Sequence, residues 1–87
     1  MGQGHYSVAD LAKMLELCAP DTKLFQRGHH YWAIRGGLRY TKIPKGSGPK
    51  GEAMSRVNIE DGRVHSIVRA LGISLECAQR HLPLAWR

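Results

Sequence analysis

Apolar residues near the start of the chain recur at steps of three and four, which is the spacing of one face of an α-helix. The apolar positions in this stretch are Val8, Leu11, Met14, Leu15 and Cys18. Ser7 precedes them as a favourable N-cap, and Asp10 stands three residues later, where it can complete a capping box. Because Pro20 cannot continue a helix, the pattern predicts a helix over residues 7–18.

The pattern then changes to strand-like segments separated by glycine turns. Residues 22–27 have strand-like content, Gly28 permits a tight turn, and residues 29–35 alternate as a second strand. Gly36 and Gly37 form a strong hairpin signal, after which residues 38–44 give a third strand. We expect the strands on either side of this turn to be antiparallel neighbours.

Alternation assigns the side chains of these strands to two sides. In the second strand it separates His30, Trp32 and Ile34 from Tyr31 and Ala33. In the third strand it separates Leu38, Tyr40 and Lys42 from Arg39, Thr41 and Ile43. We expect Trp32 to fill the space between the sheet and the helices.

The C-terminal part returns to helical spacing. Apolar residues from Val64 to Leu71 fit a helix over residues 61–71, and Gly72 is placed to end it. A short final helix begins after the Ser74 cap and stops before Pro83. Residues 45–58, rich in glycine and lysine at their start, are expected to form a mobile basic loop.

This order of elements predicts a single α+β domain over residues 1–87. We expect an α-β-β-β-α arrangement with a three-stranded antiparallel sheet, helices on one face and a short extra C-terminal helix.

Charge is concentrated in the middle of the chain. The 87 residues carry a net charge of +6, and residues 23–56 contain eight Lys or Arg and one acidic residue, Glu52. A basic middle indicates a surface that meets a polyanion, of which nucleic acid is the commonest. Two alternatives stay open: a basic face that binds an acidic protein, and a charge cluster that serves only solubility.

The two cysteines, Cys18 and Cys77, stand beside apolar residues in helical segments, and the chain shows no secretory signal. We therefore expect reduced, buried thiols in a cytoplasmic protein without a membrane span. Cys77 and His81 are four residues apart and would share a helix face, but the two cysteines are 59 residues apart. This spacing is not typical of a zinc finger, so we expect no metal site.

Four segments in this order resemble the HicA-type (YcfA-like) mRNA interferase toxins. The segments are QRGHHYWAI, RYTKIP, RVHSIVRALGIS and LECAQRHL, which together span most of residues 23–82. His29 stands where the family has serine in a Gly-Ser-His motif, if His30 is the family's histidine. The resemblance implies a fold like the double-stranded RNA-binding domain, cleavage of mRNA without a metal or other cofactor, and inhibition by an antitoxin protein.

A histidine suits this chemistry on physical grounds. Imidazole has a reference pKa of about 6.5, so it can accept the proton of a ribose 2′-hydroxyl near neutral pH, and nearby cations stabilise the charge on the phosphate. We expect His30 to be catalytic, with His29 as its neighbour or substitute. Because alternation separates the pair, we expect at most one of them to face the substrate. Alternation also puts His30 on the side of Trp32, toward the core, so His29 is the alternative catalytic residue. The alternative is that both are exposed strand residues without a role, and that the protein is a non-catalytic RNA- or DNA-binding module with the same fold.

Further residues are expected to bind the nucleic acid. The cations are Arg27, Arg35, Arg39, Lys42, Lys45 and Lys50. Tyr31, beside the histidines, is the expected stacking partner for a base.

Overall fold

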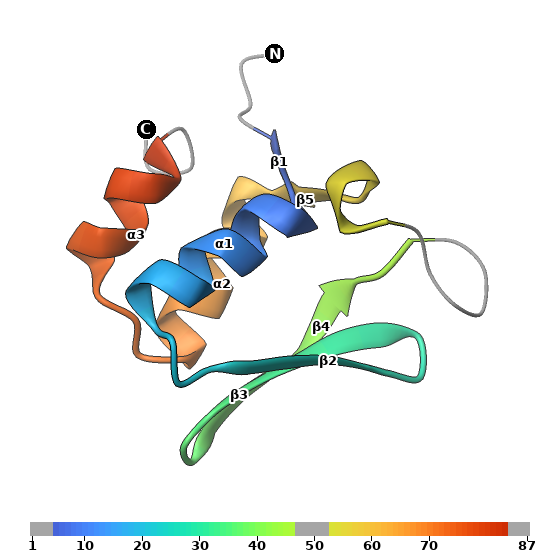
Figure 1. The fold of residues 1–87 in the computed structure, drawn as a ribbon, viewed down its shortest axis with the longest axis horizontal. Helices are drawn as coiled ribbons and strands as arrows, with labels where there is room; N and C mark the ends of the chain where they lie inside the picture. The colour runs from blue at the N-terminus through green and yellow to red at the C-terminus, as the bar shows by residue number, and fades with distance from the viewer. Residues whose placement is uncertain (1–4, 47–52, 84–87) are drawn as a thin grey trace.

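The computed structural model describes residues 5–46 and 53–83, with the elements arranged as in Figure 1. The helices are α1 (Val8–Cys18), α2 (Asp61–Ala70) and α3 (Leu75–His81), and η1 (Met54–Arg56) is a short 3-10 turn. The strands are β1 (His5–Ser7), β2 (Lys23–Arg27), β3 (His30–Arg35), β4 (Leu38–Pro44) and β5 (Asn58–Glu60). The predicted α+β class is confirmed.

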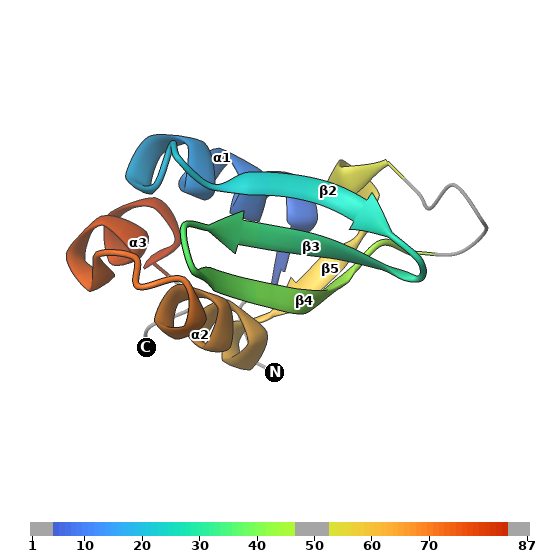
Figure 2. The same ribbon diagram turned by 90° about the horizontal axis from the view of Figure 1, so that it is seen from below.

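The main sheet is antiparallel, with the strand order β2-β3-β4. The three helices lie on one of its faces (Figure 1). Figure 2 looks onto the opposite face, which none of the described elements covers. The described helices therefore leave one face of the main sheet open.

Local signals place the helix ends as expected. The side chain of Ser7 accepts a hydrogen bond from the Asp10 backbone, and the Asp10 carboxylate accepts one from the Ser7 backbone at 2.9 Å, which completes the capping box. Gly72 follows α2 with a φ of +61°, and Ser74 caps α3 through the Cys77 backbone. These short-range interactions are encoded within four residues of chain.

Two short strands were not predicted. β1 pairs antiparallel with β5, so that Tyr6 lies opposite Ile59, and β5 begins at Asn58, the last residue of the predicted loop over residues 45–58. Val57 and Ile59 are buried in the core, and the Val57 carbonyl accepts a hydrogen bond from the Val8 backbone at 2.8 Å. Strands of three residues are too short to show an alternating pattern, so their pairing depends on tertiary contacts.

The core lies between the sheet and the helices. Its fully buried large side chains come mainly from α1, α2 and the strands beside them: Val8, Leu11, Met14, Ile43, Ile59, Val64, Ile67, Leu71 and Leu82. β3 contributes Ala33, which is fully buried, while Trp32 lies opposite Phe25 on the other side of the sheet. The expectation that Trp32 fills the core is therefore wrong; Tyr31 and Ala33 form the core side of this strand.

An irregularity in β4 changes which of its residues face the core. Tyr31 pairs with Ile43 and Ala33 pairs with Tyr40, so β4 has one extra residue over this interval. Because of the extra residue, Tyr40 and Ile43 both lie on the core side, although simple alternation separates them. Ile43 is fully buried, and Tyr40 packs against the core.

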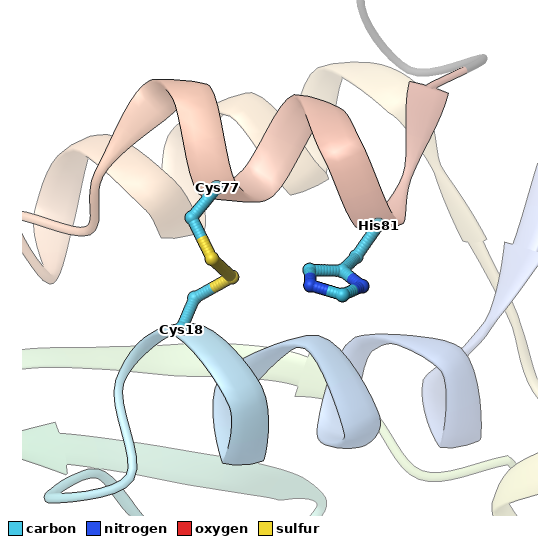
Figure 3. A group of neighbouring side chains, drawn as sticks. All are labelled: Cys18, Cys77 and His81. Atoms are coloured by element: carbon cyan, nitrogen blue, oxygen red, sulfur yellow. A yellow bond between two sulfur atoms is a disulfide. The ribbon is translucent and has the colours of Figure 1, made fainter.

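A disulfide joins Cys18, the last residue of α1, to Cys77 in α3 (Figure 3). The expectation of reduced, buried thiols is therefore wrong for this structure, and both cysteines are only partly buried. The two Cα atoms lie 5.8 Å apart although 59 residues separate them in the sequence. Packing of α3 beside the end of α1 brings them together.

Candidate nucleic-acid interface

A pocket of about 480 Å³ lies at the end of the sheet where the β2–β3 turn meets the start of α2. We call it the histidine pocket. Its lining residues are His29, His30, Lys42, Pro44, Lys45, Gly46, Asn58, Ile59, Glu60 and Arg63. Three segments that are distant in the sequence thus meet around both predicted catalytic histidines.

The tight turn after β2 brings both histidines to this pocket. Arg27 pairs with His30, which leaves Gly28 and His29 as a two-residue hairpin loop. Gly28 has a φ of +64°, and a glycine with positive φ at the first central position is typical of a type II′ turn. His29 is therefore a turn residue, so strand alternation does not separate it from His30. The premise that both histidines lie in one regular strand is therefore wrong, and which of them faces a substrate stays a prediction.

Both imidazoles are accessible. His29 and His30 are exposed, and His30 pairs on its other side with Pro44 at the end of β4. His30 is the first residue of β3 and lies, like Trp32, on the uncovered side of the sheet. It therefore does not point into the core, although residues on the side of Trp32 were expected to do so. Two accessible imidazoles in one pocket can exchange protons with a bound molecule.

The charge around the histidines is mainly positive. Lys42, Lys45 and Arg63 line the pocket, against the single acid Glu60. Lys45 is only 4% exposed, although it was expected in a mobile loop, so its charge acts on the pocket from a held position. A pocket lined by more cations than acids attracts an anion such as a phosphodiester.

Arg63 was missed in the sequence because it lies outside the basic stretch of residues 23–56. It comes from the first turn of α2, and its Nη1 donates hydrogen bonds to the Lys42 carbonyl at 2.9 Å and to the Tyr40 hydroxyl at 3.1 Å. These bonds hold the guanidinium beside β4. The sequence feature that could have indicated Arg63 is its place as the first residue of RVHSIVRALGIS, one of the segments that resemble the toxin family.

Arg35 lies at the opposite end of β3 from the histidines. Its Nε donates to Asp21 at 3.0 Å, and its Nη1 donates to the carbonyls of Leu71 and Gly72, each at 2.9 Å. The first contact is an ion pair, and the other two satisfy carbonyls at the C-terminal end of α2. The structure therefore gives Arg35 a structural role rather than a place beside the histidines.

The other predicted binding residues are divided between two surfaces. Tyr31 is half-buried and packs against the core, so it does not line the histidine pocket. Arg39 is exposed and lies opposite Ile34 on the uncovered face of the sheet. Lys50 lies outside the described residues.

The uncovered face of the sheet carries an aromatic patch formed by Phe25, Arg27 and Trp32, which we call the sheet patch. The rings of Phe25 and Trp32 have centroids 6.3 Å apart, and the Arg27 guanidinium lies 4.5 Å from the centre of the Trp32 ring. Phe25 is 38% exposed. Trp32 is half-buried, and accessible aromatic surface beside a guanidinium is suited to stacking with unpaired bases.

Comparison with protein family models, curated proteins and solved structures finds no match for this chain. Within residues 5–46 and 53–83, no helix has the length and apolar content needed to cross a membrane.

Proposed function

We propose that this protein binds RNA at the histidine pocket and cleaves it without a metal ion, as the resemblance to HicA-type toxins implies. The observation that carries the proposal is the presence of His29 and His30 in one accessible pocket with Lys42, Lys45 and Arg63. Imidazoles supply proton transfer, and the cations attract the phosphodiester, which are the two needs of this reaction.

The proposed reaction is an attack of the RNA on its own backbone. One imidazole accepts the proton of the ribose 2′-hydroxyl, and the 2′-oxygen forms a bond to the adjacent phosphorus. The bond from phosphorus to the 5′-oxygen breaks, and the second imidazole, in its protonated form, donates a proton to that leaving oxygen. The products are a 2′,3′-cyclic phosphate and a free 5′-hydroxyl. DNA lacks the nucleophile and is not cleaved.

Lys42 and Arg63 are the cations proposed to stabilise the transition state. Negative charge grows on the phosphate oxygens during the attack, and donors already held in place stabilise it without reorganisation. The bonds from Arg63 to Tyr40 and to the Lys42 carbonyl favour this role because they fix one side of the guanidinium. Lys45 adds positive potential from its buried position.

The same resemblance leads us to propose mRNA as the substrate, the cytoplasm as the location and an antitoxin protein as the partner. The excess of positive charge around the histidine pocket supports an acidic partner that covers it. Such a partner would compete with RNA for the same cations, so its binding would weaken with added salt.

A non-catalytic single-stranded nucleic-acid-binding module is the second candidate. It is favoured by the sheet patch, where Phe25 and Trp32 lie on the uncovered face with Arg27 above one ring. Aromatic rings on an open sheet can stack with bases without cleaving the strand, and each stacked base contributes about 1–3 kcal/mol.

Cleavage of a labelled single-stranded RNA in excess chelator tests the first candidate. The wild type, His29→Ala, His30→Ala and the double variant are compared, with His65→Gln on α2 as the matched histidine control. We expect loss of cleavage of about 10²–10⁴-fold in at least one histidine variant, with RNA affinity kept. Cleavage unchanged in the double variant would refute catalysis by this pair, and binding without cleavage in the wild type would favour the second candidate.

A further inference from the structure

Three side chains of the types that bind metals meet on the side of the molecule where α3 packs beside α1. Cys18, Cys77 and His81 have their ligand atoms within 4.8 Å of one another. Figure 3 shows the disulfide between the two helices and the His81 ring beside it. Neither the histidine pocket nor the sheet patch includes any of these residues.

We propose that the reduced protein binds a zinc ion at this cluster, through the two thiolates and the His81 imidazole. Zinc prefers thiolate sulfur at about 2.3 Å and imidazole nitrogen at about 2.0–2.1 Å in a tetrahedral arrangement. Such a geometry separates two sulfurs by about 3.8 Å and a sulfur from a nitrogen by about 3.6 Å. The three ligand atoms lie within 4.8 Å of one another, and the two sulfurs, bonded to each other in the disulfide, are free to move apart once it is reduced.

The elements of the fold hold the ligands in place for such a site. Cys77 and His81 are four residues apart on α3, so their side chains share one helix face. Cys18 ends α1 opposite this face, as Figure 3 shows. The expectation of no metal site was based on the 59 residues between the cysteines. Because α3 packs beside the end of α1, the two cysteines nevertheless lie next to each other.

The fourth position of the site has access to solvent. His81 is exposed, and it also lines a second pocket of about 300 Å³ formed with Tyr6, Asp10, Lys13, Met14 and Leu82. A three-ligand zinc site usually completes its coordination with water, which can be exchanged for another ligand. The site is therefore open rather than closed.

Metal binding and the disulfide exclude each other because both use the same sulfur atoms. Two equivalents of a thiol reductant supply two electrons and two protons to the Cys18–Cys77 bond, giving two protein thiols and one oxidised reductant disulfide. Zinc then binds as the two thiols release their protons. In a reducing cytoplasm the thiol form dominates, and the cluster would hold metal.

Binding is tested on the full chain after reduction with a phosphine and removal of metal. Zinc affinity is measured by competition with a chromophoric chelator, and cobalt(II) serves as the spectroscopic probe, because thiolate ligands give charge-transfer bands and a tetrahedral site gives intense visible bands. We expect one equivalent to bind the reduced wild type, and none to bind this cluster in the oxidised protein.

Three variants test the ligands. His81→Ala keeps both sulfurs, and we expect it to weaken zinc binding by at least about tenfold, since loss of even an outer partner costs about 10–100-fold. His81→Cys should restore tight binding with a third thiolate. His65→Gln removes a histidine of α2, outside this cluster and outside the histidine pocket, and should leave the affinity unchanged.

The proposal is overturned if the reduced wild type binds no zinc, or if His81→Ala binds as tightly as the wild type. It is also overturned if the oxidised protein binds one equivalent with the same affinity. Circular dichroism of each sample reports folding: a reduced chain that refolds on adding zinc supports the site, and one that stays unfolded counts against it. RNA cleavage has no part in these readouts.

Discussion

Arg63 of α2 donates a hydrogen bond to the backbone carbonyl of Lys42 in β4 across 2.9 Å, and thereby connects the first turn of a helix to the edge of the main sheet. The same nitrogen reaches the Tyr40 hydroxyl at 3.1 Å. Both partners lie where β4 has its extra residue, so the irregular strand and the arginine together shape one wall of the histidine pocket.

Replacing Arg63 should therefore affect stability and RNA binding together. Arg63→Ala leaves the Tyr40 hydroxyl and the Lys42 carbonyl without this donor, and we expect the free energy of unfolding to fall by about 1–2 kcal/mol. RNA affinity should fall as well, because the histidine pocket then has one cation fewer. Urea unfolding and a salt series of RNA binding measure the two effects. Arg69→Ala, an exposed arginine later on α2, is the control, and an equal loss in both variants would contradict the prediction.

The β2–β3 turn depends on the positive φ of Gly28. Gly28→Ala should lower the free energy of unfolding by about 1–2 kcal/mol, because an L-residue is strained at a φ of +64°. No atom lies within 4 Å of a Cβ built at Gly28 or at Gly37, so steric contact does not distinguish the two sites. Gly37 has no positive φ, and Gly37→Ala should therefore be close to neutral. Thermal unfolding of both variants checks this, and equal destabilisation would argue against backbone strain.

Two arginines of the β3–β4 hairpin should behave in opposite ways. Arg35→Ala removes the ion pair with Asp21 and two bonds to α2 carbonyls, so we expect a decrease of about 1–3 kcal/mol in unfolding free energy. Arg39→Ala removes an exposed cation from the uncovered face of the sheet and should leave stability within about 0.5 kcal/mol. Under the RNA-binding proposal, Arg39→Ala also lowers the salt dependence of binding, by about 0.7 in the log–log slope for each phosphate that the protein no longer neutralises. Stability changes of the reverse order would reject these assignments.

The disulfide should contribute substantially to the stability of the oxidised protein. It closes a loop with a sequence separation of 59, for which the chain-entropy estimate is about 4 kcal/mol. We expect Cys77→Ser in metal-free buffer to lower the free energy of unfolding by about 2–4 kcal/mol. Guanidinium unfolding of the oxidised wild type and the variant measures the difference. Reduced wild type without metal should match the variant, and a variant as stable as the oxidised protein would contradict the estimate.

Local signals in the sequence predicted most of the elements but not all of their contacts. The capping box of Ser7 and Asp10, the turns at Gly28 and Gly36, and the end of α2 at Gly72 are determined within a few residues, and the structure confirms each of them. Which side of β3 faces the core was predicted wrongly. The larger Trp32 suggested the buried side, whereas the fully buried residue of this strand is the small Ala33.

The features that the sequence did not predict arise from contacts between segments that are distant in the sequence. The pairing of β1 with β5, the meeting of Cys18 with Cys77, and the place of Arg63 beside Lys42 all depend on how the helices dock. No local sequence pattern determines how the helices dock, because docking depends on the packing interactions of the whole core. The sequence pattern also did not predict that both histidines line one pocket. That prediction requires knowing that His29 lies in the turn rather than in the strand.

The histidine pocket is assembled from three separate stretches, residues 29–30, 42–46 and 58–63. A synthetic peptide of the hairpin alone would carry both imidazoles yet lack the wall that β5 and α2 supply. Any activity that requires the whole pocket therefore appears only once the helical layer has closed over the sheet, which would make turnover a reporter of complete folding for this chain.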